Sequence, residues 1–233
     1  MLYMLGSDLE SEIGLATVDL DSIDYDKVDN ENINIVLIAG GSKEWHNDYI
    51  AEDETSIYEL TEDGFKKVKK QRTKNMGSAS TLSDFLNYAY ENYPANNFDL
   101  IFWNHGGAIH GSESDKIYGD NLSLEDMEKA FEDSPFKENN KLETIFFRTC
   151  LNGSIENALV FDDYAKYLVA SEELTRGSQF SSVLNFINEI EVDDEKYDTG
   201  VKFIESYEQQ IKDMSEIYKS SYYSTYSIVN LEN

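Results

Sequence analysis

Short apolar runs that stop abruptly at polar or small residues recur along the chain. Such runs are typical of strands buried inside a parallel sheet, because both faces of each strand are covered there. They predict strands at residues 2–5, 33–39, 98–107, 143–153 and 164–170. The ranges 98–107 and 143–153 include the polar and small residues that follow the apolar run. Two further segments, 49–60 and 65–68, predict a hairpin, and residues 222–231 predict a last strand.

Between these runs, apolar residues recur at the spacing of one helix face. The predicted helices cover residues 9–23, 80–93, 123–133, 154–160, 180–190 and 201–214. Pro94 ends the second of these helices, and Ser123 is the N-cap of the third. Strands that alternate with helices, without an internal repeat or a second core, predict a single α/β domain over residues 1–233.

Two of the predicted strands end in residues that can carry chemistry. One delivers His105, followed by two glycines, and the other delivers Cys150, the only cysteine. Ligands and reacting groups gather at the carboxyl ends of strands in open α/β sheets. A thiol nucleophile needs a base to take its proton and backbone N–H groups to hold the developing oxyanion, and these two strand ends offer both. The helix predicted just after Cys150 would favour its thiolate.

Other interpretations of these residues are open. A lone cysteine is most often a small buried apolar residue. His46 and His110 compete with His105 for the role of base, but no strand positions His110, and His46 would at most lie at the edge of a substrate site. The strand-end placement of His105 and Cys150 favours them as the reacting pair.

The net charge of −27 argues against nucleic acid and against anionic membrane surfaces as partners. It is consistent with solubility, a salty habitat, or attraction of basic substrates or Ca²⁺. No cofactor is expected to be required. The pairs Asp19 with Asp21 and Asp24 with Asp26 are weak Ca²⁺ candidates, because they lack the glycine and the final glutamate of an EF-hand loop.

A single cysteine excludes an internal disulfide, and no apolar stretch is long enough to span a membrane. No signal peptide is recognised at the start of the chain, which begins almost inside a strand. A secreted protein whose leader has been trimmed fits this start.

Several segments resemble the clostripain family of cysteine peptidases, which has the caspase-like fold. They are the opening LYMLGSDLES, the long stretch that ends in NNFDLIFWNHGG, the cysteine segment TCLNGSIENA, and AKYLVASEELTRG. The resemblance implies a three-layer sandwich, with a mostly parallel sheet of about six strands between helices. It also implies a catalytic dyad of His105 and Cys150, with an oxyanion hole formed by the backbone N–H groups of Gly106 and Cys150. Peptides or proteins would be the substrates.

The chain departs from this family just before the cysteine. Family members typically carry Asp-Ala-Cys where this chain has Arg148, Thr149 and Cys150. The family's acidic residue lies in the S1 pocket and pairs with Arg or Lys at P1, and alternation along a strand gives positions 148 and 150 the same face. Arg148 would therefore repel a basic P1 side chain and favour Asp or Glu.

The alternative for Arg148 is an ion pair with a nearby acid, for which Glu172 and Glu173 are candidates. Ser171 and Glu172 lie at the next strand end, where they either line the S1 site or cap a turn.

Several relatives mature by cleaving themselves between the histidine and the cysteine. The polar loops 111–121 and 134–142 are the candidate segments here, and with an acidic P1 the candidate cut points are Glu113, Asp115, Asp120 and Glu138. A non-catalytic peptide- or protein-binding module on the same fold is the alternative function. The substitutions at Arg148 and Thr149 favour it, whereas the presence of both His105 and Cys150 argues against it.

Overall fold

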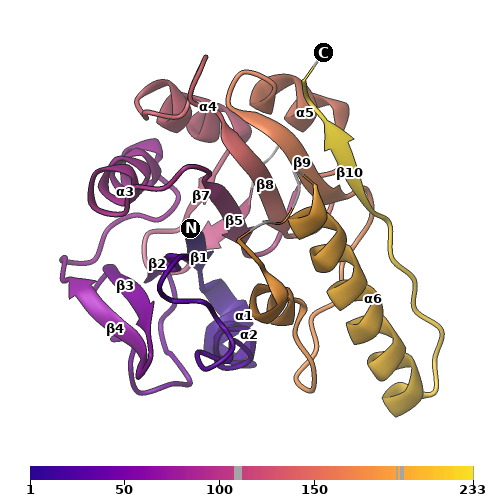
Figure 1. Ribbon diagram of the computed structural model, residues 1–233. Helices are drawn as coiled ribbons and strands as arrows, with labels where there is room; N and C mark the ends of the chain where they lie inside the picture. The colour runs from indigo at the N-terminus through magenta and orange to yellow at the C-terminus, as the bar shows by residue number, and fades with distance from the viewer. Residues whose placement is uncertain (108–111, 193, 195–196, 233) are drawn as a thin grey trace.

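An eight-stranded sheet forms the centre of the protein in the computed structural model, which describes residues 1–107, 112–192, 194 and 197–232. Its order is β10-β9-β8-β5-β1-β2-β3-β4 (Figure 1). The five inner strands are parallel and pair side by side. They are β2 (Val36–Gly40), β1 (Leu2–Leu5), β5 (Asp99–Trp103), β8 (Leu142–Arg148) and β9 (Ala165–Ser171).

Three antiparallel strands extend this parallel centre at its two edges. The hairpin of β3 (Ser56–Thr61) and β4 (Gly64–Lys69) pairs with β2, and β10 (Tyr226–Asn230) pairs with β9. The expectation of a mostly parallel sheet is confirmed, but the expected number of about six strands is too low. A hairpin read from sequence does not reveal which sheet it joins. A separate two-stranded sheet pairs β6 (Ser112–Asp115) with β7 (Asp120–Leu122) inside the segment predicted as a loop.

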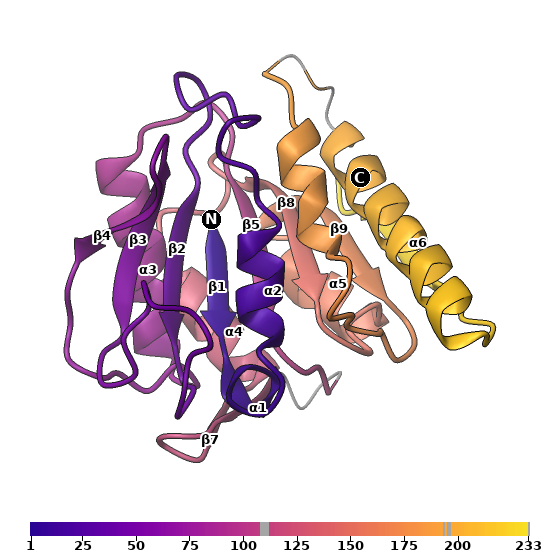
Figure 2. The ribbon, with the colours of Figure 1, turned by 90° about the horizontal axis from the view of Figure 1, so that it is seen from below.

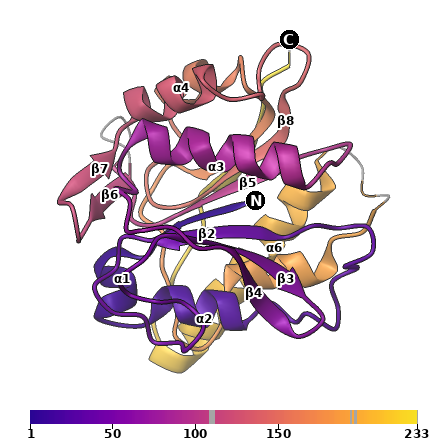
Figure 3. The same cartoon turned by 90° about the vertical axis from the view of Figure 1, so that its left-hand side faces the viewer.

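Helices cover both faces of the sheet, as Figure 3 shows from the side. On one face lie α3 (Ala79–Asn92), α4 (Leu124–Glu132) and α5 (Ile155–Phe161), which share a core with Phe102 and Phe147. The opposite face, seen in Figure 2, carries α2 (Leu15–Asp21), the 3₁₀ helix η2 (Val183–Glu189) and α6 (Asp198–Tyr218), which pack on Trp103 and Phe146. Neighbouring residues of one strand thus enter two different cores, which explains the uninterrupted apolar runs.

The predicted helix over 9–23 is two helices in the structure. α1 (Ser7–Ser11) ends before Gly14, which adopts a left-handed conformation with φ of 65° and begins α2. Glycine accepts this conformation without the steric cost that a side chain brings, so the chain can turn there. The break leaves α1 at the carboxyl end of β1. None of the helices in the described part of the chain is long and apolar enough to cross a membrane.

Candidate active site

The strand ends that carry His105 and Cys150 are direct neighbours. β5 and β8 are parallel, and Trp103 lies opposite Arg148 at their carboxyl ends. His105 and Cys150 each follow two residues later, so both reach the same edge of the sheet. The residue after His105 packs against the cysteine backbone, since a Cβ built on Gly106 would lie 1.9 Å from the Cys150 carbonyl oxygen. Only glycine permits this approach.

The Cys150 sulfur lies beneath the segment that follows β9. The side chain is half-buried, and its Sγ accepts a hydrogen bond from the Thr175 backbone N–H at 3.3 Å. The Thr175 hydroxyl lies 3.5 Å from the same sulfur. The thiol also donates to the Thr175 carbonyl oxygen at 3.7 Å, so Thr175 holds the sulfur through several of its polar atoms. The next residue, Leu151, has a φ of 60°, an uncommon conformation for a residue with a side chain.

His105 is held through its backbone and contacts an acid with its ring. Its backbone N–H donates to Asn104 Oδ1 at 2.7 Å, and the same oxygen accepts from the Ser7 hydroxyl at 2.9 Å. Its ring Nε2 lies 3.3 Å from Oδ1 of Asp8 in α1. Sequence reasoning missed Asp8 and Asn104. The available signal was the acidic segment just after the first strand, at the strand edge predicted to carry the chemistry.

Arg148 is buried and paired. Only 4% of the residue is exposed, and its Nη2 lies 3.5 Å from Oδ2 of Asp19 in α2. The same carboxylate oxygen accepts a 2.6 Å hydrogen bond from Trp103 Nε1. Burial by itself lowers the pKa of Arg148, but the Asp19 carboxylate together with Tyr226, Tyr207 and Cys150 outweighs burial and raises that pKa above its ordinary value. Of the two alternatives for Arg148, an ion pair is present, but its partner is Asp19 rather than Glu172 or Glu173.

The family model of the clostripain family matches this sequence over residues 2–231. The chain belongs to the clostripain family. No curated protein matches the sequence.

Solved structures of C11 cysteine proteases resemble this clostripain-family chain in fold. A secreted C11 cysteine protease from Bacteroides thetaiotaomicron, solved with an irreversible peptide inhibitor, is 16% identical with a TM-score of 0.73. An inactive zymogen C11 protease from Parabacteroides distasonis is also 16% identical, with a TM-score of 0.66. Both alignments cover 99% of this chain, which spans 65% of the first structure and 60% of the second.

The other residues expected near the S1 site of this clostripain-family chain differ in exposure. Ser171 is buried, and its hydroxyl lies 2.7 Å from the Thr225 hydroxyl and donates to the Glu173 carbonyl oxygen at 3.1 Å. These bonds hold the turn after β9, as the capping interpretation expects. Glu172 is exposed at the same turn, with its backbone against Gly153. The role of Ser171 and Glu172 toward a substrate stays a prediction.

Of the two other histidines, the structure describes only His46. His46 is exposed, and its backbone N–H donates to Glu10 at 2.7 Å. Its ring lies beside Gly14. His110 lies outside the described residues.

Three of the four suggested Ca²⁺ ligands contact other protein groups. Asp19 is buried against Arg148, Asp21 accepts from the Tyr49 hydroxyl at 2.9 Å, and Asp24 pairs with Lys27 at 3.2 Å. Within the described residues, no group of three or more His, Cys, Asp or Glu side chains could hold a metal ion. A calcium requirement stays a prediction without a site.

The candidate cut points also differ in accessibility. Asp115 is fully buried and accepts hydrogen bonds from the backbone N–H groups of Met76, Ile117 and Tyr118. A peptidase could not reach this side chain in the folded state. Asp120 and Glu138 are exposed. The side chain of Glu113 lies outside the described part of the structure.

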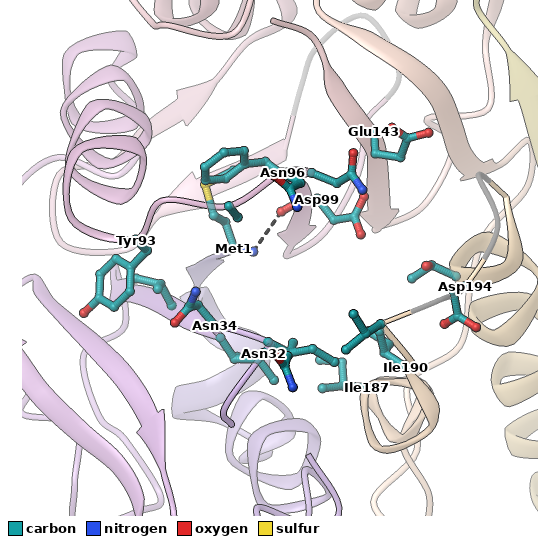
Figure 4. A pocket seen from close by; sticks show the side chains of 18 of the residues that line it. Met1, Asn32, Asn34, Tyr93, Asn96, Asp99, Glu143, Ile187, Ile190 and Asp194 are labelled. Atoms are coloured by element: carbon teal, nitrogen blue, oxygen red, sulfur yellow. Dashed lines mark hydrogen bonds between the residues drawn. The ribbon is translucent and has the colours of Figure 1, made fainter. Parts of the chain in front are cut away.

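A cavity of about 830 Å³ lies at the opposite edge of the sheet, near the amino ends of the parallel strands (Figure 4). The amino group of Met1 donates there to the Asp99 carbonyl oxygen at 2.8 Å. Glu143, near the start of β8, and Asp194 also line this cavity (Figure 4). The length of the sheet separates this cavity from Cys150, so it is not the site of the proposed chemistry.

Proposed function

We propose that the chain is a cysteine endopeptidase in which Cys150 and His105 act as a dyad. The observation that carries the proposal is the register of β5 and β8, with Gly106 packed on the Cys150 peptide. This contact brings a thiol and an imidazole to one strand edge. The family membership and the fold shared with C11 cysteine proteases support the same chemistry.

In the proposed reaction the Cys150 sulfur attacks the carbonyl carbon of the scissile peptide bond. The thiol proton passes to His105 and then to the leaving amine as the C–N bond breaks. The backbone N–H groups of Gly106 and Cys150 hold the oxyanion, and each donor contributes about 3 kcal/mol at the transition state. Water then cleaves the thioester, which releases the new carboxylic acid and restores the thiol.

The test is labelling with a peptide electrophile combined with hydrolysis of fluorogenic peptides. One adduct per chain is expected, absent in Cys150→Ala, with hydrolysis lost in both Cys150→Ala and His105→Ala. Full hydrolysis by either variant would overturn the dyad. Tight peptide binding without an adduct would support the non-catalytic binding module instead.

The finer proposal concerns P1, where the preference has moved from Arg and Lys to acidic side chains. Arg148 replaces the family's acidic residue, so a basic P1 side chain meets a like charge there. Nε and Nη2 of Arg148 are buried and make no hydrogen bond within the described structure. These donors suit a carboxylate. Asp19 neutralises part of the charge, so we expect a preference over Arg and Lys rather than an exclusive one.

A matched peptide series with Glu, Gln, Asp, Arg and Lys at P1 tests this preference. We expect Glu to be cleaved faster than its neutral isostere Gln, and Arg and Lys to be slowest. Fastest cleavage after Arg or Lys would refute the proposal, and equal rates for Glu and Gln would show that the charge of Arg148 is not recognised.

The proposed function includes self-processing, in which the chain cleaves itself between His105 and Cys150. One neighbour in fold is an inactive zymogen. Of the candidate cut points whose side chains the structure describes, Asp120 and Glu138 are exposed. The parent chain should split into two bands on a gel while Cys150→Ala stays whole, and a whole parent chain with full activity would contradict self-processing.

We also propose that no metal is required. EDTA should then leave the rate of hydrolysis unchanged. A rate that EDTA lowers and added Ca²⁺ restores would overturn this point.

A further inference from the structure

Asp8 lies beside the imidazole of His105. Asp8 Oδ1 and His105 Nε2 are 3.3 Å apart. Both atoms are buried, and neither makes a hydrogen bond within the described structure. The bonds of catalytic groups are commonly long in a substrate-free enzyme and tighten when substrate binds. The two atoms are therefore positioned for one another.

The fold places Asp8 there at a cost. Ser7 has a φ of 51° and is fully buried at the turn that leads from β1 into α1. A residue with a side chain rarely adopts this conformation, because its Cβ crowds the following carbonyl oxygen. The Ser7 hydroxyl donates to Asn104 Oδ1, which also accepts the His105 N–H, and the Ser42 hydroxyl donates to the Ser7 carbonyl oxygen at 2.9 Å. These bonds fasten the end of β1 to the end of β5.

A second cation lies on the same carboxylate. Lys116 Nζ is 3.3 Å from Asp8 Oδ1, and it comes from the segment after β6, which lies next to α1 in Figure 3. Burial by itself raises the pKa of Asp8. The backbone N–H of Asp8, His105 and Lys116 together outweigh burial and lower this pKa below its ordinary value. Asp8 is consequently ionised at neutral pH.

We propose that Asp8 is a positioning residue for His105. It accepts the Nε2–H of the ring and thereby selects the tautomer whose Nδ1 lone pair is free to take the Cys150 proton. When the imidazolium forms, the Asp8 carboxylate compensates its charge. This inference rests on the proposed dyad and adds a third residue to it. The logic is that of the aspartate in serine proteases, which orients a histidine without being protonated itself.

Asp8→Asn in the full chain tests the proposal, with Glu12→Gln as the matched control. Glu12 is exposed one helical turn further along and loses the same charge. We expect kcat to fall at least about 10-fold in Asp8→Asn, with KM within about threefold. Partners that orient a metal-bound histidine contribute about 10- to 100-fold, and the aspartate of serine proteases contributes about 10⁴-fold. The control should retain the parent's kcat.

A spectroscopic measurement separates positioning from a merely structural role. Long-range ¹H–¹⁵N correlations of the His105 ring should show the Nε2–H tautomer in the parent and a mixture in Asp8→Asn. An Nδ1–H tautomer in the parent would overturn the proposal even if the variant failed to fold. Parent-like kcat and tautomer in Asp8→Asn would also overturn it. Loss of activity in His105→Ala and Cys150→Ala establishes the dyad independently, so failure of the two proposals can be distinguished.

Discussion

Replacing Gly106 by alanine tests the contact on which the site depends. The added Cβ would lie 1.9 Å from the Cys150 carbonyl oxygen and 2.7 Å from its backbone nitrogen. Real Cβ atoms essentially never approach other heavy atoms more closely than 3.0 Å, so the two strand ends must separate by about 1.1 Å. Both obstructing atoms belong to the backbone, which cannot rotate away as a flexible side chain does.

The magnitude follows from this displacement. A misplacement of about 1 Å at reacting groups can cost on the order of 100-fold in rate. Inserting a methyl group into a packed region costs about 1–3 kcal/mol of folding free energy. Gly106→Ala should therefore lose about 100-fold in kcat/KM toward a fluorogenic peptide, while the chain remains folded.

Gly64→Ala is the matched control. Gly64 lies in the turn between β3 and β4, with a φ of 95° and no atom within 4 Å of the added Cβ. It should lose about 1 kcal/mol of stability through backbone strain and keep its activity. Thermal unfolding and hydrolysis are measured on both variants. Activity of Gly106→Ala within about threefold of the parent would refute the inferred contact between the two strand ends.

Three further predictions concern buried charges. Arg148→Met leaves Asp19 buried without its partner and should cost about 3–5 kcal/mol in urea unfolding. Adding Asp19→Leu should recover part of the loss, because the double variant has no unpaired charge but leaves the Trp103 Nε1–H without its acceptor. If the double variant were no more stable than Arg148→Met, the loss in the single variant would not come from breaking the ion pair. Asp115→Asn weakens three charge-assisted hydrogen bonds and should cost about 2 kcal/mol by the same measurement, whereas an unchanged midpoint would contradict these bonds. Lys67 holds the pKa of Glu54 below its ordinary value of 4.5, so this pair contributes stability above that pH and loses it as the pH falls through the lowered pKa. Glu54→Gln should flatten the stability curve in that acidic window, and a curve parallel to the parent's would refute the assignment.

The sequence was most informative where burial on both faces leaves an uninterrupted apolar run. The strands that carry His105 and Cys150 are of this kind, and each ends sharply at its first polar residues. The sequence also predicted segments for β3, β4 and β10, but it could not show that they join the central sheet, because no local signal specifies those pairings. It also missed the break at Gly14, where apolar spacing continues through a change of direction.

Partners of charged residues were harder to predict. The chain has 46 acidic residues, and nothing local distinguishes Asp19 as the partner of Arg148. The pair forms because α2 packs on the face of the sheet that Arg148 enters from β8, a consequence of tertiary structure. Glu172 and Glu173 were the natural guesses, since they follow the adjacent strand, but alternation and turn geometry leave them in solvent.

The strand order accounts for the placement of the three residues proposed for the site. β5 lies between β8 and β1, so His105 has a neighbouring strand end on each side. β8 supplies Cys150 on one side, and β1 leads into Asp8 on the other. All three strands are parallel, so their carboxyl ends meet at one edge without further bending of the chain. The proposed nucleophile, base and positioning carboxylate then follow one another in an order set by the sheet. Two local features accompany this order: the positive φ at Ser7 precedes Asp8, and the close approach at Gly106 joins the residue after His105 to the Cys150 backbone.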